Sequence, residues 1–262
     1  MPTSAPSPTI DLRHAIAIGT PKAIDLWLDV VDDPTRRADE LTELSKAEVR
    51  TLADLLSPEA AADLVDTLDL HVAVDAVRLL PPRAVANMVE ALESDRAAEL
   101  LRELTPAERE GILSLVSPDQ ASLLRTLLDW PDESVAAHMV PEVLTVSDQV
   151  SAAEAIEQVR NHRAKLRQDS HIGAYVFAVD ATNRLVGVVS FRELVLADAD
   201  RPVRDLVEED VITVGPLVDQ EEAARTLTKH RLLAIPVVDE DNHLLGVLTA
   251  DGIEDLVHRR RQ

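Results

Sequence analysis

The sequence contains no cysteine, and its only aromatic residues are two tryptophans, two phenylalanines and one tyrosine. The absence of cysteine excludes disulfide bonds, thiolate zinc sites and cysteine nucleophiles, and it is compatible with a reducing compartment. Because aromatic side chains are so few, the hydrophobic cores must be built from Ala, Val, Leu and Ile. The apolar fraction of 46% is still ordinary for a globular protein, so the chain is not expected to be globally disordered.

Long apolar runs are also missing. No stretch approaches the roughly 18 consecutive apolar residues that a membrane-spanning helix needs, so we expect this polypeptide alone not to cross a bilayer as a helix. The N-terminal segment lacks the basic start and apolar run of a secretory signal. We therefore expect a cytoplasmic protein, with a disordered N-terminus at residues 1–9.

Signatures of catalysis are absent as well. The sequence has seven glycines but no phosphate-binding loop or dinucleotide fingerprint, and no serine lies in a nucleophile elbow. The eight histidines are scattered without the i, i+4 spacing of helical metal ligands. The chain is therefore not expected to be an enzyme.

Basic residues are few relative to acidic ones, 26 against 48, which gives a net charge of −22. Such a surface repels phosphate backbones, so nucleic acid is not expected as a partner. A dense acidic surface also repels itself, and divalent cations relieve that repulsion. Composition alone favours the simpler interpretation, in which the acidic excess only keeps the protein soluble.

The first half carries an apolar residue at every twelfth position. This column consists of Leu44, Leu56, Leu68, Leu80, Leu92, Leu104, Val116 and Leu128. The residues that follow are mostly helix N-cap types, namely Ser45, Ser57, Asp69, Thr105 and Ser117, with Asp129 extending the series where the repeat ends. Prolines then occupy the first helical turn, where a missing N–H costs nothing, at Pro58, Pro82, Pro106 and Pro118.

A second apolar column lies eight residues into each unit. It consists of Leu52, Leu64, Ala76, Met88, Leu100, Ile112 and Leu124. A helix of about nine residues is marginal alone, whereas stacked units share a continuous core. We therefore predict a right- or left-handed superhelix of short helices over residues 10–130. A plain helical bundle is the alternative, which the strict spacing disfavours.

The second half, residues 131–257, contains two copies of a β-α-β-β-α pattern, so the fold class is α followed by α/β. The first copy comprises Val143–Val146, Ser151–His162, Tyr175–Asp180, Gly187–Ser190 and a helix that begins at Phe191. The second comprises Val211–Val214, Glu221–His230, Ala234–Asp239, Gly246–Thr249 and a closing helix. Turn-forming residues at Asp180–Asn183 and Asp239–Asn242 predict two hairpins.

Both copies resemble CBS modules. The shared element is a Val-Asp pair followed by Leu, Gly and a hydroxyl residue. It reads Val179-Asp180, Leu185, Gly187 and Ser190 in the first copy and Val238-Asp239, Leu244, Gly246 and Thr249 in the second. The first module is expected at about 138–200 and the second at about 201–257, before a basic tail at 258–262. The resemblance implies a tandem CBS pair, a unit that often binds adenine nucleotides in its cleft and regulates a transporter, channel or enzyme.

The wider context resembles the cytoplasmic part of MgtE magnesium transporters. Trp130–Glu133 and Met139–Glu142 are similar to the linker of that family, and Asp219–Glu222 and Ile235–Asp239 are similar to its second module. The order of helical domain and CBS pair is also that of the family. The resemblance implies a homodimer through the CBS domains. It also implies a membrane transport domain, on a longer chain or a separate one, which places the protein at the inner face of the cell membrane.

In that family, Mg²⁺ held by acidic clusters between the helical domain and the CBS pair favours a closed pore. The resemblance implies a set of metal ligands that consists of Asp63, Asp95, Glu99, Asp219, Glu221, Asp251 and Asp255. The physics is consistent, because Mg²⁺ prefers carboxylate oxygens and retained waters. Two carboxylates ~4 Å apart repel by about 4 kcal/mol at an effective dielectric constant of 20. Without the resemblance, each of these residues reads as a solvated acid.

Several positions depart from the family pattern. Arg231 stands where the family usually carries an acid, and Gly252 stands where a second acid normally follows Asp251. In the linker, Ala136-Ala137-His138 replaces a Gly-Gly-Leu. These departures imply either a reduced affinity for magnesium or a rearranged site.

The resemblance also implies a site for ATP or another adenine nucleotide in the first module, built from Tyr175, Ser190, Arg192 and Glu193. Tyr175 would stack on adenine, and Glu193, in place of the more usual Asp, would bind ribose hydroxyls. In the second module Leu232 replaces an aromatic residue and Gly252 removes the ribose acid. The alternative is that Tyr175 belongs to the core and that Arg192 and Glu193 form a surface pair.

Three functions remain open at this point. The first is a magnesium-sensing gate, favoured by the acid positions and the domain order. The second is a free-standing regulator that binds adenine nucleotides. The third is a structural adaptor whose helical stack grips a partner protein.

Overall fold

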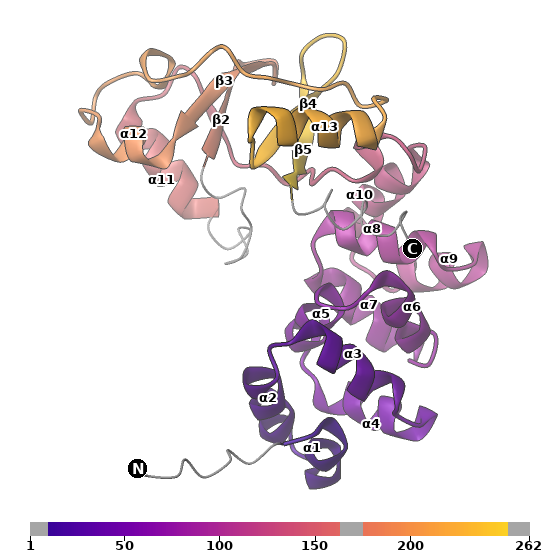
Figure 1. Ribbon diagram of the computed structural model, residues 1–262. Coiled ribbons are helices and arrows are strands. Elements are labelled where there is room, and N and C mark those ends of the chain that lie inside the picture. Colours follow the sequence, from indigo (N-terminus) through magenta and orange to yellow (C-terminus); the bar gives the residue numbers. More distant parts are fainter. Residues whose placement is uncertain (1–9, 163–174, 251–262) are drawn as a thin grey trace, which may run out of the picture. The chain divides into compact units, whose positions relative to one another are not determined.

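The computed structural model describes residues 10–162 and 175–250 (Figure 1). The chain divides into two compact units after Arg125. Residues 1–9 and 258–262, for which a disordered N-terminus and a basic tail are expected, lie outside the described residues, as does most of the segment expected to form the closing helix of the second module.

Short α-helices make up the first unit. They are α1 (Leu12–Ile18), α2 (Pro21–Val30), α3 (Pro34–Thr42), α4 (Lys46–Leu55), α5 (Pro58–Asp66), α6 (Leu70–Val77), α7 (Pro82–Ala91), α8 (Ser94–Arg102), α9 (Pro106–Leu113) and α10 (Pro118–Asp129), the last of which continues past Arg125. Helices two apart in sequence pack on one another, as α5 does on α7, α7 on α9 and α6 on α8. This arrangement confirms the predicted stack of short helices.

The twelve-residue step sets where helices begin. Pro58, Pro82, Pro106 and Pro118 are each the first residue of a helix, as the sequence predicts. Ser45 and Thr105 form capping boxes with the glutamate three residues later. Asp69 precedes α6 without a side-chain cap bond. The extension of the series to Asp129 is wrong, because Asp129 ends α10 instead of preceding a helix.

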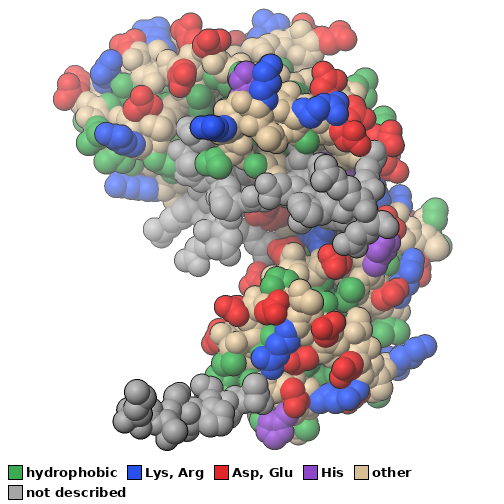
Figure 2. All heavy atoms as spheres, in the orientation of Figure 1, with side chains coloured by type: hydrophobic (Ala, Val, Ile, Leu, Met, Phe, Trp, Pro, Cys, Tyr) green, Lys and Arg blue, Asp and Glu red, His purple; other side chains and the backbone are tan. Residues whose placement is uncertain are grey.

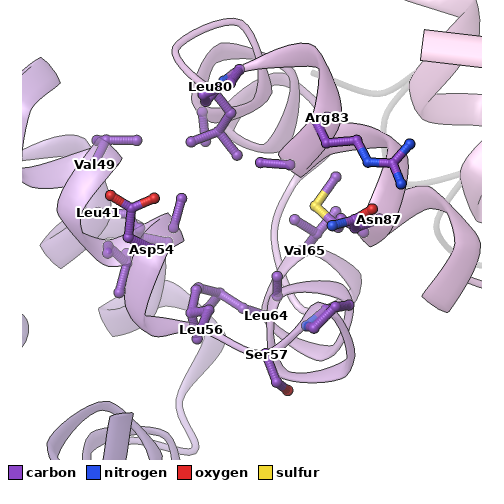
Figure 3. A pocket seen from close by; sticks show the side chains of 18 of the residues that line it. Leu41, Val49, Asp54, Leu56, Ser57, Leu64, Val65, Leu80, Arg83 and Asn87 are labelled. Carbon is purple, nitrogen blue, oxygen red and sulfur yellow. The ribbon is translucent and has the colours of Figure 1, made fainter. Parts of the chain in front are cut away.

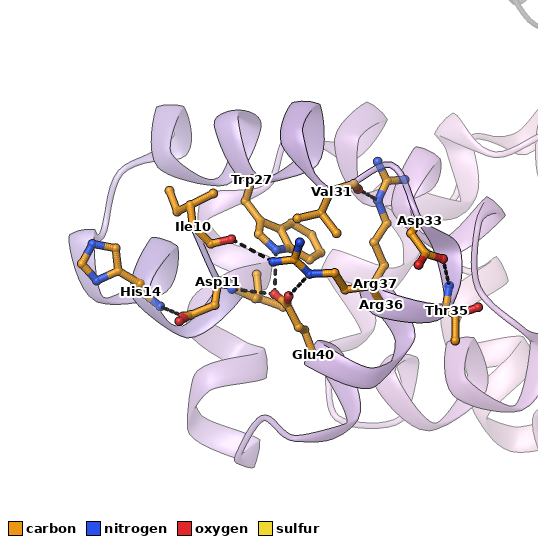
Figure 4. Close-up of polar contacts among 11 residues, drawn as sticks. Ile10, Asp11, His14, Trp27, Val31, Asp33, Thr35, Arg36, Arg37 and Glu40 are labelled. Atoms are coloured by element: carbon orange, nitrogen blue, oxygen red, sulfur yellow. Dashed lines mark hydrogen bonds and ion pairs between the residues drawn. The ribbon is translucent and has the colours of Figure 1, made fainter. Parts of the chain in front are cut away.

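A half-buried carboxylate, that of Glu40, ties the first three helices together (Figure 4). Its Oε2 accepts hydrogen bonds from the Trp27 indole N–H and the Leu12 backbone N–H, both at 2.8 Å. Its Oε1 accepts one from Arg36 Nε at 2.7 Å. Trp27 and Leu12 are almost completely buried. The start of the stack is therefore fixed by a polar anchor as well as by apolar packing.

The second unit contains two hairpins and their helices. The first sheet has the order β1 (Thr145–Ser147), β2 (Tyr175–Val179), β3 (Leu185–Ser190), with β1 parallel and β3 antiparallel to β2. Helices α11 (Ala152–His162) and α12 (Phe191–Leu196) belong to this module. The second sheet pairs β4 (Ala234–Val238) with β5 (Leu244–Thr249), and α13 (Gln220–His230) precedes it.

One predicted strand is not formed. Residues 211–214 were expected to be the first strand of the second module, but Val214 makes only an isolated parallel bridge to Val237. The segment is held by two hydrogen bonds, from Val214 N to Pro236 O and from Val238 N to Val214 O. Pro236 has no N–H to donate, so the ladder cannot extend in the usual way.

The two hairpins share a core. Its buried members come from both modules and are Phe177, Val179, Leu185, Val238, Leu244 and Val247. A separate core fills the first module between its sheet and α11 and α12. The second unit is therefore a mutually supporting pair of modules, in agreement with the expected CBS pair.

Candidate functional site

A cavity of about 700 Å³ lies in the first module, beside the end of β3 and the start of α12. Its lining consists of Val188, Ser190, Arg192, Glu193, Leu196, Ala197, Arg201, Asp205, Leu206, Val207 and Glu208. Three of the four predicted nucleotide-binding residues, namely Ser190, Arg192 and Glu193, therefore line one cavity. That volume is in the range that holds a small organic ligand.

Ser190 and Glu193 fix the start of α12 through a capping box. Glu193 Oε2 accepts hydrogen bonds from Ser190 Oγ at 2.9 Å and from Ser190 N at 3.2 Å. Ser190 Oγ accepts one from Glu193 N at 3.1 Å. The Glu193 side chain is thus oriented by its own helix while its second oxygen, Oε1, carries none of these bonds. A carboxylate held in this way is suited to accept hydrogen bonds from ligand hydroxyls.

Two arginines face the same cavity. Arg192 is exposed and makes no hydrogen bond or ion pair with the part of the chain that the structure describes. Arg201 donates from Nη2 to Asp205 O at 3.2 Å, which leaves other guanidinium N–H groups available. Arginine is well matched to phosphate oxygens. The acids Asp205 and Glu208 line the cavity too, so its charge is mixed.

Gly187 explains how the outer wall of the cavity forms. Val188 and Glu208 exchange backbone hydrogen bonds, at 3.0 Å for Val188 N and 2.8 Å for Glu208 N. A Cβ at position 187 would collide with the backbone of Glu208 and the side chain of Val207. Only glycine lets the Val207–Glu208 segment lie against β3. Sequence reasoning missed Arg201, Asp205 and Glu208, because nothing local in the sequence shows which segment fills that space.

Tyr175 is the first residue of β2, and its Cα is paired with that of Ser190. The strand register therefore brings the fourth predicted nucleotide residue next to the cavity residues. Leu232, which stands for an aromatic in the second module, follows α13 and is half-buried. Gly252 lies outside the described residues.

Asp95, one of the predicted metal ligands, lies in the first turn of α8. Its Oδ1 is buried and has no hydrogen-bond partner among the described residues. Burial raises the pKa of Asp95 to about 7, and repulsion from the Glu93 and Glu99 carboxylates adds to the rise. An oxygen in this situation would gain from a cation placed beside it.

Glu99 lies one turn further along α8 and is paired with Arg96. Arg96 Nη1 is 2.7 Å from Glu99 Oε2, and both side chains are largely buried. The other end of the guanidinium donates from Nη2 to Leu68 O at 2.7 Å and to Val65 O at 3.2 Å. Arg96 therefore holds Glu99 in place and links α8 to the end of α5.

The remaining predicted metal ligands are exposed or lie outside the described residues. Asp63 is exposed on α5. Asp219 is the N-cap of α13, accepting from Glu221 N at 2.8 Å, and Glu221 is 3.7 Å from Arg225. Asp251 and Asp255 fall beyond residue 250. Within the described residues, no three metal-ligating side chains come together.

Among the positions that depart from the family pattern, Arg231, Ala136 and Ala137 have identifiable local structural roles. Arg231 is the C-cap of α13 with φ 55°, a left-handed conformation that costs energy in a residue with a Cβ. Ala136 and Ala137 are completely buried in a 3₁₀ turn, and Ala136 N donates to Pro216 O. The linker residues thus anchor the segment before α13.

Comparison with known proteins agrees with this architecture. The family model of the MgtE intracellular N domain matches residues 32–133, and the CBS domain model matches residues 134–200 and 203–258. The magnesium transporter MgtE of Enterococcus faecalis is 35% identical over 139 residues, which is 53% of this chain and 30% of the relative. MgtE of Bacillus subtilis is 31% identical over 147 residues, which is 56% and 32% of the two chains. The aligned part is about a third of the length of these relatives.

Two solved structures match almost the whole chain. The crystal structure of the soluble part of a magnesium transporter is 28% identical, with a TM-score of 0.80, and the match covers 96% of this chain and 100% of that one. The cytosolic domain of the Mg²⁺ channel MgtE in complex with ATP is 26% identical, with a TM-score of 0.82, and the match covers 94% and 98%. Fold and domain order therefore define a helical domain joined to a CBS pair. The chain therefore has the helical N domain and the CBS pair that are found in the intracellular part of MgtE magnesium transporters.

None of the helices in residues 10–162 and 175–250 has the length and apolar character needed to span a bilayer.

Proposed function

We propose that this chain is the magnesium-sensing regulatory region of an MgtE-type transporter, located at the cytoplasmic face of the membrane. The relatives named magnesium transporters are about three times longer than the aligned part. In this proposal transport is the task of a membrane domain, and the present chain regulates it without catalysing a reaction. The expected assembly is a homodimer through the CBS domains.

Asp95 carries the proposal. An ionised carboxylate with a buried, unpartnered oxygen is costly, and its raised pKa of about 7 reflects that cost. Mg²⁺ binds carboxylate oxygens while keeping several of its waters, so it fits a site with few protein ligands. A bound dication would favour the ionised form of Asp95 and offset the repulsion from Glu93 and Glu99.

The other acids would complete the site across the two units. Asp63 and Glu99 lie with Asp95 in the first unit, and Asp219 and Glu221 lie in the second. Asp251 and Asp255 remain predicted ligands. Glu99 would have to exchange its partner Arg96 for the cation, or serve to position it. With Mg²⁺ bound the acids would be held together, and without it their repulsion would separate them.

Acid is abundant elsewhere on the molecule too. Asp and Glu side chains are spread over the face seen in Figure 2 instead of gathering in one patch. A general ion atmosphere around such a surface would respond to Na⁺ as well as to Mg²⁺. Specific sensing therefore has to be tested against this background.

The test is calorimetric titration of Mg²⁺ into the chain at constant ionic strength. Asp95→Asn should weaken Mg²⁺ binding about tenfold or more, because the amide keeps the shape but loses the charge. Asp25→Asn is the matched control, since Asp25 is an exposed acid on α2 outside the proposed site. Equal binding by the wild type and both variants would contradict a role for Asp95.

A second ligand class, ATP or another adenine nucleotide, is supported by the cavity in the first module. Ser190, Arg192 and Glu193 line it together, and Arg201 supplies a second guanidinium. One solved relative is an ATP complex. Calorimetry with ATP, ADP and AMP tests this proposal, and Arg192→Ala should lower the affinity for whichever nucleotide binds. Absence of heat with all three nucleotides would refute it.

A further inference from the structure

The first unit contains a second cavity, of about 400 Å³, that none of the proposed functions uses (Figure 3). It lies among α4, α5 and α7, with contributions from the ends of α3 and α6. Its walls are mainly aliphatic. The buried members of the lining are Leu41, Val49, Leu52, Leu64, Val65, Leu68 and Met88.

The twelve-residue repeat explains why the space exists. Leu52, Leu64, Ala76 and Met88 are successive members of the second apolar column, and all four line the cavity. Ala76 is the only member of the column, from Leu52 to Leu124, without a long side chain. A repeat that places a large side chain in each unit has therefore lost one here, and its neighbours on α4, α5 and α7 have not closed the gap.

Aliphatic surface that faces water in a concave space is unfavourable. The side chains around it also lack the dispersion contacts of a close-packed interior. Water gains little there, because an apolar wall offers few hydrogen bonds. An apolar molecule that fills the space recovers those contacts, so the cavity is suited to a hydrocarbon ligand.

The polar side chains of the lining are few, namely Asp54, Ser57, Arg83 and Asn87. Figure 3 shows Asp54 on one side of the cavity and Arg83 and Asn87 on the other. Arg83 Nη1 donates to Leu115 O at 3.2 Å, which directs its charge toward the end of α9. Asp54 is exposed, Asn87 is half-buried, and neither side chain makes a hydrogen bond or ion pair with the described residues. Besides the hydroxyl of Ser57, which accepts a hydrogen bond from Ala60 N, the polar groups left for a ligand are thus a carboxylate and an amide.

We propose that this cavity binds a small hydrophobic amine, whose hydrocarbon part fills the space left by Ala76 and whose ammonium group pairs with Asp54. An ammonium group has only donors, which match the carboxylate of Asp54. A carboxylate head would instead meet the negative charge of Asp54. The net charge of −22 favours a cationic ligand for the same reason.

Calorimetry and thermal melting with octylamine and octanoate as matched probes test the proposal. The two probes have the same chain length and opposite charge at neutral pH. Octylamine should bind and raise the melting temperature, and octanoate should bind at least tenfold more weakly. Equal affinity of the two probes, or no binding of octylamine below its aggregation concentration, would overturn the proposal.

Variants of the protein test separately how the hydrocarbon chain and the ammonium group of the ligand contribute to binding. Ala76→Leu restores the repeat, so it should raise the melting temperature without ligand and weaken octylamine at least tenfold. Ala47→Leu adds the same side chain on the exposed face of α4 and should leave binding unchanged. Asp54→Asn should weaken octylamine about fivefold, the size of a partly exposed ion pair, while Asp25→Asn should not.

If Ala76→Leu does not fold, a second variant that fills the cavity still tests the proposal. Ala84→Leu enters the cavity from α7 and should act as Ala76→Leu does. If either folded filling variant binds octylamine as tightly as the wild type, the assignment to this cavity is wrong.

Discussion

Asn183 and Asn242 occupy equivalent positions in the two hairpin turns, and each donates its side-chain amide to the other module. Asn242 Nδ2 donates to Leu185 O at 2.8 Å, and Asn183 Nδ2 donates to Leu244 O at 3.2 Å. Their backbones repeat the exchange, because Leu185 N donates to Asn242 O and Leu244 N donates to Asn183 O. Both residues are left-handed, with φ 65° and 66°. This reciprocal contact joins the two modules into one unit.

Substitution of Asn242 separates its two roles. Asn242→Gly keeps the left-handed backbone and loses the amide bond, so it should cost about 1 kcal/mol of stability. Asn242→Ala should cost about 2 kcal/mol, because it adds the strain of a Cβ at positive φ. Urea unfolding of the two variants measures the difference. Equal stabilities for Gly and Ala would show that the backbone conformation carries no cost.

Because the Glu40 carboxylate accepts hydrogen bonds from three helices, even the substitution of glutamine for Glu40 should lower stability markedly. Glu40→Gln cannot accept all three hydrogen bonds from Leu12, Trp27 and Arg36, so it should destabilise the first unit by about 2 kcal/mol. Glu43→Gln is the control, because that side chain is 72% exposed and 4.0 Å from Arg13. Tryptophan fluorescence during urea unfolding, recorded with Trp130→Phe in every variant so that only Trp27 emits, reports on this contact. A Glu40→Gln variant that is as stable as the wild type would contradict this role of Glu40.

Gly187 and Gly111 differ in the space around them, so alanine substitutions at the two positions should change stability in opposite directions. Gly187→Ala should cost about 3 kcal/mol and disturb the nucleotide cavity, because its Cβ would collide with backbone atoms of Glu208. Gly111→Ala in α9 should instead raise stability by about 0.5 kcal/mol, since nothing lies within 4 Å of the added Cβ. Thermal melting of both variants checks the signs. Destabilisation by both would mean that the close approach at Gly187 is not the cause.

Asp95 predicts a pH dependence with a definite sign. Its folded pKa of about 7 lies above the ordinary value of 3.8, so between these values the folded state holds more protons than the unfolded state. The contribution of Asp95 to the free energy of unfolding is therefore greatest below pH ~4. It falls as the pH rises toward ~7 and stays low above that value. Asp95→Asn should raise stability at pH 8 by at most about 4 kcal/mol and leave it unchanged at pH 4.

Urea unfolding of the wild type and Asp95→Asn at the two pH values measures this difference. Addition of Mg²⁺ at pH 8 should narrow the gap between them, because the cation stabilises the ionised carboxylate of the wild type. A gap of the same size at pH 4 and pH 8 would show that the charge of Asp95 is not the cause.

Local signals in the sequence predicted the helical stack well. The prolines and cap residues act within one turn, so their positions fix helix starts whatever the tertiary packing. The missing strand at residues 211–214 shows the limit of that reasoning. Its apolar run is β-forming, but its pairing depends on Pro236, a neighbour distant in sequence.

The candidate sites were predictable only in part. Ser190, Arg192 and Glu193 lie within four residues of each other, so one helix start brings them together. Glu208 reaches the same cavity through the close approach at Gly187, which no local pattern reveals. The cavity beside Ala76 was not predicted, because a short apolar residue in the second column fits the repeat as well as a long one does. Whether such a gap closes or stays open depends on the packing of α4, α5 and α7.

The central claim, that Mg²⁺ binding by acids from both units controls how compact the chain is, is tested most directly by small-angle scattering. The radius of gyration would be measured during a Mg²⁺ titration at constant ionic strength, with Asp95→Asn as the comparison. We predict a decrease in the wild type at millimolar Mg²⁺ and a decrease shifted to higher concentration in the variant. A radius that stays constant throughout the titration would contradict the account.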